Sequence, residues 1–157
     1  MTTIADRTAP VADTAEARTI AYEYDARGRQ VKTIFPDAWQ VDANGALVAT
    51  GTQPQVVVTY DALDRAVVQK DVRGNYSYKV YDGQGQLAYD VDEAGYVTAY
   101  AYDAFGEQTG VRRYANKLDF SKLSGWSAGQ AITLAQIGGA GALTADAATD
   151  RVLTTTY

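Results

Sequence analysis

The feature of this sequence that most constrains its fold is the recurrence of the tetrapeptide Asp-x-x-Gly. Copies occur at residues 25–28, 42–45, 71–74, 82–85, 92–95 and 103–106. In a type I turn, a leading Asp accepts hydrogen bonds from backbone N–H groups two residues on. A Gly in the fourth position takes up a left-handed conformation that is costly for residues with a Cβ. Because such a turn with its bulge joins antiparallel strands, the tetrapeptide predicts β-hairpins.

The spacing of these turns predicts a repeating meander. Asp61–Asp64 supplies a further turn in which Asp64 replaces the glycine, since Asp tolerates the left-handed conformation. From there the turns begin at 61, 71, 82, 92 and 103, which leaves six or seven residues for each strand. That is the usual strand length. Two turns form a 21-residue unit that opens with Tyr-Asp, as at Tyr60-Asp61, Tyr81-Asp82 and Tyr102-Asp103. We therefore expect an all-β, antiparallel β-meander of about nine to eleven strands.

Segments between the turns are rich in β-branched and aromatic residues, as at 56–60, 76–81 and 96–102. Residues 19–25 alternate in the same way and predict a half-buried strand with Ile20, Tyr22 and Tyr24 on one side. The spacing of 36 positions from Tyr24 to Tyr60 exceeds the 21-residue period by about 15. We expect an inserted hairpin over residues 36–54.

Changes in composition divide the chain further. Residues 1–17 are expected to form a polar leader, 18–114 the meander, 115–149 an insertion, and 150–157 the start of the next repeat strand. The Ala/Gly-rich part, near 117–149, predicts mainly non-β structure. A short helix is expected over 127–137, with Ser127 as N-cap and Gly138 at its end.

Several functional classes are disfavoured by composition. The chain has no His, the commonest general base and metal ligand, and no Cys. Its 14 basic and 19 acidic residues are scattered, so nucleic-acid binding is not expected. No apolar run reaches membrane-spanning length, and the first residues lack the pattern of a signal peptide. Twelve Tyr against three Phe predict a sheet whose aromatic face is only partly dry.

The segment Tyr24-Asp-Ala-Arg-Gly-Arg29, with its relatives at 60, 81 and 102, resembles the YD-repeat, or rearrangement-hotspot (Rhs), family. The resemblance covers roughly residues 18–114 and the last strand. It implies a ribbon of β-strands that forms part of a β-shell around a C-terminal toxin, as in bacterial toxin complexes and polymorphic toxins; the teneurins carry a related barrel. Such proteins are usually very large and are secreted or displayed at the cell surface. Since no shell-closing region is recognisable, we expect this chain to be part of a longer array.

Candidate sites have competing structural explanations. Asp90, Asp92 and Glu93 suggest calcium, but the EF-hand ligand order is absent and a turn explains Asp92. The Gly138–Gly141 stretch lacks the Lys-Ser/Thr of a phosphate-binding loop and is interpreted as a linker. Asn75-Tyr-Ser77 fits a glycosylation sequon. No nucleophile–base pair is visible, so we expect no catalytic, cofactor-binding or metal-binding residues.

Two functions remain open. The first is a non-catalytic structural module of a shell that encapsulates a toxin or effector within a larger secreted or bacterial cell-surface protein. The alternative is an adhesin or carbohydrate-binding module that uses Tyr residues and Trp39. The expected partners are adjacent repeats of the same or a parent chain, an encapsulated toxin domain, and glycans. We also expect self-association, because a meander exposes two sheet edges and an aromatic face.

Overall fold

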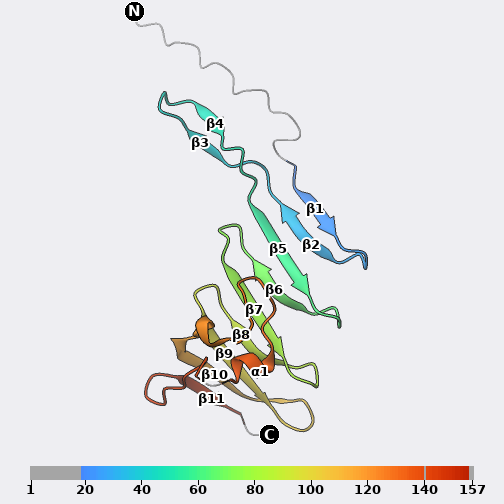
Figure 1. Cartoon of the computed structure of the whole chain (residues 1–157), viewed down its shortest axis with the longest axis vertical. Helices are drawn as coiled ribbons and strands as arrows, with labels where there is room; N and C mark the ends of the chain where they lie inside the picture. The colour runs from blue at the N-terminus through green and yellow to red at the C-terminus, as the bar shows by residue number, and fades with distance from the viewer. Residues whose placement is uncertain (1–18, 140, 156–157) are drawn as a thin grey trace, which may run out of the picture. The chain divides into compact units, whose positions relative to one another are not determined.

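Antiparallel hairpins build most of the described part of the chain, as the computed structural model shows (Figure 1). The structure describes residues 19–139 and 141–155, so the leader expected over 1–17 lies outside the described part. Two units divide the chain, residues 1–56 and 57–157, and each is described by itself. The described residues contain strands β1 to β11, which confirms the all-β expectation.

The first unit contains two hairpins. Strand β1 (Ala21–Tyr24) pairs with β2 (Gln30–Ile34), and β3 (Trp39–Val41) pairs with β4 (Leu47–Ala49). The second pair is the hairpin expected over residues 36–54. The prediction of a half-buried first strand is wrong, because every residue of β1 is exposed. All fully buried apolar side chains among the described residues belong to the second unit, so β1 has no core to pack against.

The second unit is a meander in which the spatial order of the strands is their order in the sequence (Figure 1). Its strands are β5 (Gln55–Tyr60), which begins at the unit boundary, β6 (Ala66–Lys70), β7 (Tyr76–Tyr81), β8 (Leu87–Val91), β9 (Tyr96–Tyr102), β10 (Gln108–Lys117) and β11 (Arg151–Thr154). Each 21-residue repeat therefore contributes two strands.

The strand register shifts beside the Tyr of each Tyr-Asp pair that opens a turn. In the second unit the shifts fall between Thr59 and Tyr60, between Val80 and Tyr81, and opposite Tyr102. A bulge adds one residue on one strand and increases the local twist. The predicted combination of turn and bulge is thus present at the same point of each repeat.

The insertion differs from the prediction in its first boundary and in the position of its helix. Strand β10 continues through Lys117 rather than ending near Tyr114, because Lys117 pairs with Tyr96. The helix is shorter than predicted: α1 (Leu134–Ile137) begins after Thr133, not after Ser127. A capping box between Thr133 and Gln136 sets the start of the helix.

Residues 127–133 do not form the expected start of the helix, because Gly129 has a φ of +86° and interrupts any helical run. A 3₁₀ turn, η2 (Phe120–Lys122), is capped by Asp119 earlier in the insertion.

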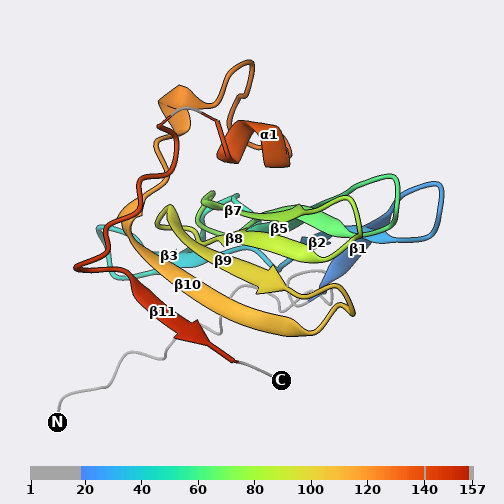
Figure 2. The same ribbon diagram turned by 90° about the horizontal axis from the view of Figure 1, so that it is seen from below.

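The insertion covers one face of the sheet (Figure 2). Its Leu123, Ile132 and Ile137 join a buried cluster with strand residues Tyr78, Val80, Val91 and Val97. The ring of Tyr78 lies 5.6 Å from that of Trp126 and 5.9 Å from that of Phe120. Tyr78 is only 2% exposed, whereas every other described tyrosine is intermediate or exposed, in keeping with an aromatic face that is only partly dry. Apolar side chains from a segment outside the repeat pattern keep the surroundings of Tyr78 dry.

Gly95 provides a test of the turn. It has a φ of +89°, and a Cβ built there would lie 3.4 Å from the ring of Phe120. We expect Gly95→Val to lower the free energy of unfolding by more than about 1 kcal/mol, because a β-branched residue is strained at positive φ. Gly83→Val is the matched control, since Gly83 lacks a positive φ and has open space at its Cβ position. Equal urea-denaturation midpoints for the two variants would mean that the turn tolerates a side chain.

Candidate functional site

The turn aspartates repeat one hydrogen-bond arrangement. At Asp71, the backbone N–H donates to the carbonyl of Asn75 at 2.9 Å, and the N–H of Gly74 donates back to the Asp71 carbonyl at 3.0 Å. The Asp71 Oδ1 atom accepts from the N–H groups of Arg73 and Asn75, at 2.9 and 2.7 Å. Oδ1 accepts the equivalent pair of bonds at Asp25, Asp42, Asp61, Asp82, Asp92 and Asp103. The turns predicted from the sequence are confirmed, and one carboxylate oxygen in each is used by the fold.

The irregular turn follows the same design. Asp64 has a φ of +65° and is the non-glycine residue with positive φ among those described. Its N–H donates to the carbonyl of Asp61 at 3.3 Å, as the glycine N–H does in the other turns. Asp64 therefore occupies the glycine position, as expected.

An arginine completes two of the turns. The Oδ2 atom of Asp61 accepts from Arg65 Nε at 2.7 Å and lies 2.6 Å from Arg65 Nη2. Asp25 and Arg29 form the same pair at the same distances. The guanidinium directs two of its nitrogens to one carboxylate oxygen, because the other oxygen accepts the backbone bonds of the turn. The sequence motif contained these arginines, but sequence reasoning assigned them no role.

Arg65 also connects its turn to the next repeat. Its Cζ atom lies 4.2 Å from the centre of the Tyr81 ring, within the range of a cation–π contact. The hydroxyl of Tyr81 donates to the carbonyl of Ala66 at 3.4 Å. Twenty-one residues on, the hydroxyl of Tyr102 donates to the carbonyl of Leu87 at 3.1 Å. Each of these tyrosines therefore bonds back to the preceding repeat.

Hydrogen bonding lowers the pKa of several turn carboxyl groups. Burial raises the pKa of Asp71, but bonds from the backbone N–H and side-chain amide of Asn75 outweigh burial, so the pKa falls below its ordinary value. The same balance lowers the pKa of Asp61, where the backbone and guanidinium of Arg65 are the donors. The turns therefore favour the ionised carboxylates.

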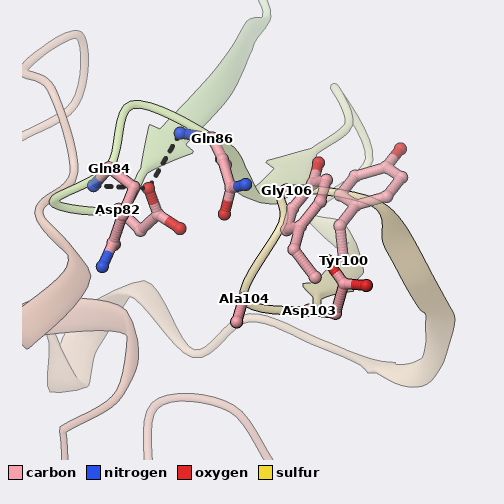
Figure 3. A pocket seen from close by; sticks show the side chains of 8 residues that line it. Asp82, Gln84, Gln86, Tyr100, Asp103, Ala104 and Gly106 are labelled. Carbon is pink, nitrogen blue, oxygen red and sulfur yellow. Dashed lines mark hydrogen bonds between the residues drawn. The ribbon is translucent and has the colours of Figure 1, made fainter.

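A polar cavity of about 300 Å³ opens beside the next turn (Figure 3). Asp82, Gln84 and Gln86 lie on one side of it, and Tyr100 and Asp103 lie on the other. Tyr102 also contributes to the lining. Sequence reasoning missed this cavity. The available signal was an exchange between repeats, because Gln86 stands where Arg65 stands one repeat earlier.

The acidic residues considered for calcium have protein partners. Asp90 Oδ2 accepts from Lys79 Nζ at 3.1 Å, and Asp92 Oδ2 accepts from Arg113 Nη2 at 3.2 Å. The other oxygen of Asp92 serves its turn. Within residues 19–139 and 141–155, no three acidic side chains are gathered in a manner suited to a metal ion.

The two remaining sequence candidates have structural roles. Gly138 is the C-cap of α1, and its N–H donates to the carbonyl of Leu134 at 3.0 Å. Asn75, the first residue of the sequon, is an exposed turn residue whose side-chain amide donates to Asp71 Oδ2 at 3.1 Å.

The lowered carboxyl pKa values predict a direction of acid sensitivity. Because the folded-state pKa of Asp71 lies below its ordinary value of 3.8, its stabilising contribution is complete above that pH and is lost as the pH falls further. Asp71→Asn keeps an oxygen that accepts the backbone bonds but removes the titration. We expect the free energy of unfolding of this variant to change less between about pH 6 and about pH 3 than that of the wild type. Urea denaturation at both pH values measures this, and identical losses in the two proteins would contradict it.

The comparisons with known proteins agree with this geometry. A model of the family described as RHS Repeat matches residues 81–117, the stretch that contains the Tyr81-Asp82 and Tyr102-Asp103 turns. No curated protein matches the chain. The regular turns, the bulged tyrosines and this match together support a repeat of the YD, or Rhs, family over residues 81–117.

Proposed function

We propose that this chain is a non-catalytic structural module that forms part of a β-strand shell around a toxin or effector in a larger secreted protein. The observation that carries the proposal is the contact from repeat to repeat. Tyr81 and Tyr102 each bond to the carbonyl of a residue 15 positions earlier, across a repeat boundary. Repeats that bury their faces and satisfy their polar groups through neighbours suit an extended wall.

The polar groups of the repeats support a structural role without catalysis. Rhs repeats are structural repeats, and in this chain Oδ1 of each turn Asp accepts two backbone N–H bonds, as at Asp71. A carboxylate committed in this way stabilises a chain reversal and is a poor candidate for a general base.

The faces and the edge of the sheet favour growth of an array. One face of the sheet is covered by the insertion. Lys79 of β7 and Asp90 of β8 are cross-strand neighbours and form an ion pair, so polar side chains also link these strands. Every residue of the last strand, β11, is exposed, including Val152 and Leu153. We propose that a further repeat of the same or a parent chain adds to this edge. The isolated chain would then self-associate, and light scattering across a concentration series tests this.

The family match supports a proposal about where the protein is located. Rhs repeats occur in secreted or surface proteins, and none of the helices in the described part of the chain has the length and apolar character needed to cross a membrane. We propose secretion or display at a bacterial surface as part of a larger protein, in keeping with the encapsulation role.

Limited proteolysis tests encapsulation. The full reading frame that encodes this chain is expressed and treated with a nonspecific protease, and the fragments are identified by mass spectrometry. If the repeats form a shell, an enclosed segment outside the repeats resists cleavage until mild denaturant opens the wall. Cleavage of every non-repeat segment at the rate seen after denaturation would overturn the proposal.

The alternative is an adhesin or carbohydrate-binding module. The observation in its favour is the exposure of Trp39, Tyr22 and Tyr24 in the first unit, since exposed aromatic rings provide flat apolar surfaces. A glycan array distinguishes the carbohydrate-binding function from the structural one. Signals that disappear in Trp39→Ala would support sugar binding, and a blank array would remove this alternative.

A further inference from the structure

Two successive repeats differ in the residues around one turn. The space between the turn Asp, the residue four positions after it and the Tyr of the next repeat is called the corner of that turn. A shift of 21 residues places Asp61 on Asp82, Arg65 on Gln86, and Tyr81 on Tyr102. The backbone design is the same in both turns, because Oδ1 of Asp61 and of Asp82 each accept two backbone N–H bonds. The first turn therefore serves as an internal reference for the second.

In the reference turn, a guanidinium fills the corner. Arg65 Nε and Nη2 contact Asp61 Oδ2 at 2.7 and 2.6 Å, and the Arg65 Cζ atom lies 4.2 Å from the centre of the Tyr81 ring. The remaining nitrogen, Nη1, is buried and lies 3.4 Å from the position of a Cβ at Gly85. Acceptor, ring and glycine together form a cradle for this group.

In the second turn, the cradle remains but the guanidinium is missing. Asp82 Oδ1 keeps its bonds to the N–H groups of Gln84 and Gln86, at 3.0 and 2.8 Å. Asp82 Oδ2, unlike that of Asp61, has no hydrogen-bond or ion-pair partner among the described residues. The cavity of about 300 Å³ is lined by this turn and by Tyr102. The Gln86 Nε2 atom lies 3.1 Å from the position of a Cβ at Gly106, so this shorter, neutral side chain fills the glycine end of the space. It leaves Asp82 Oδ2 without the partner that Arg65 provides one repeat earlier.

Charge distinguishes the two corners further. In the reference turn, Arg65 pairs with the carboxylate of Asp61, while Lys79 pairs with Asp90. One repeat later, Gln86 stands at the position of Arg65 and Tyr100 at that of Lys79, so neither cation is present. The residues that line the cavity therefore include two acidic side chains and no basic one.

We infer that this cavity binds a guanidinium group, presented by an arginine side chain of another polypeptide. Asp82 Oδ2 supplies an oxygen that can accept from two guanidinium nitrogens, and the Tyr102 ring supplies the stacking surface, as Asp61 and Tyr81 do for Arg65. The inference goes beyond the structural role proposed above and does not depend on it. It rests on the occupied equivalent site within the same chain, not on acidity alone.

The first experiment is an NMR titration of the chain with N-acetyl-arginine methylamide, with backbone amide shifts as the readout. We expect saturable shifts at Gln84, Gln86 and Asp103. The two caps remove the α-ammonium and α-carboxylate charges, so the response reports the guanidinium group alone. The matching lysine derivative lacks the planar group that stacks on a ring and directs two N–H donors to one acceptor. Equal binding of the lysine compound, or no saturable shift with arginine, would overturn the inference.

Variants locate the site. Gln86→Arg supplies the guanidinium internally and should abolish the response, while Asn75→Arg adds the same charge to a turn outside the cavity lining and should preserve it. Arg65→Gln should open a second site and produce new saturable shifts around residues 61–65. If Gln86→Arg does not fold, Asp82→Asn replaces it, since the amide oxygen still accepts the turn bonds. If the Gln86→Arg or Asp82→Asn variant still bound the arginine compound, the ligand would bind outside this cavity and the inference would be wrong.

Discussion

The structure depends on a short-range interaction, the acceptance of two backbone N–H bonds by one oxygen of each turn aspartate. This pair of bonds fixes where the chain reverses and places a left-handed residue at the fourth position, whether Gly74 or Asp64. The reversal sets the strand register, because a hairpin's register follows from its turn. The bulge beside each Tyr-Asp pair then directs tyrosines such as Tyr81 toward the preceding repeat.

Turns alone do not provide a dry core. The first unit has the same turn at Asp25, with the same Arg29 pair, yet β1 is exposed throughout. The core lies where the insertion adds apolar side chains such as Ile137 to one face of the sheet. Hydrophobic burial stabilises by about 25 cal/mol per Å² of apolar surface, whereas a two-stranded hairpin is marginal on its own. Local turns therefore determine the topology, and the insertion contributes most of the burial.

The difference between local turns and long-range packing explains which parts of the fold could be predicted from the sequence. The hairpins, the 21-residue period and the unusual Asp64 follow from local chemistry, so they were predictable from tetrapeptides. The cover over Tyr78 was not, because it comes from residues far along the chain whose packing no periodicity reveals. The helix was placed too early because Ser127 is a reasonable cap, while the left-handed Gly129 and the Thr133 capping box decide its actual start. The exchange of Arg65 for Gln86 was readable from the repeats, but its consequence needed the cavity.

A repeat protein can acquire a binding site by omitting an internal group. Arg65 is tethered, so its pairing with Asp61 costs only side-chain entropy, and partly exposed pairs of this kind contribute about 0.2–1 kcal/mol. Loss of that pair at Gln86 is therefore tolerated by an array whose turns are held mainly by backbone bonds. The vacated corner keeps its acceptor and ring, because Asp82 and Tyr102 are still required for the turn and for the bond to Leu87. The fold itself thus keeps the site preorganised. Binding of an external guanidinium is then opposed mainly by the ligand's own loss of translational and rotational freedom.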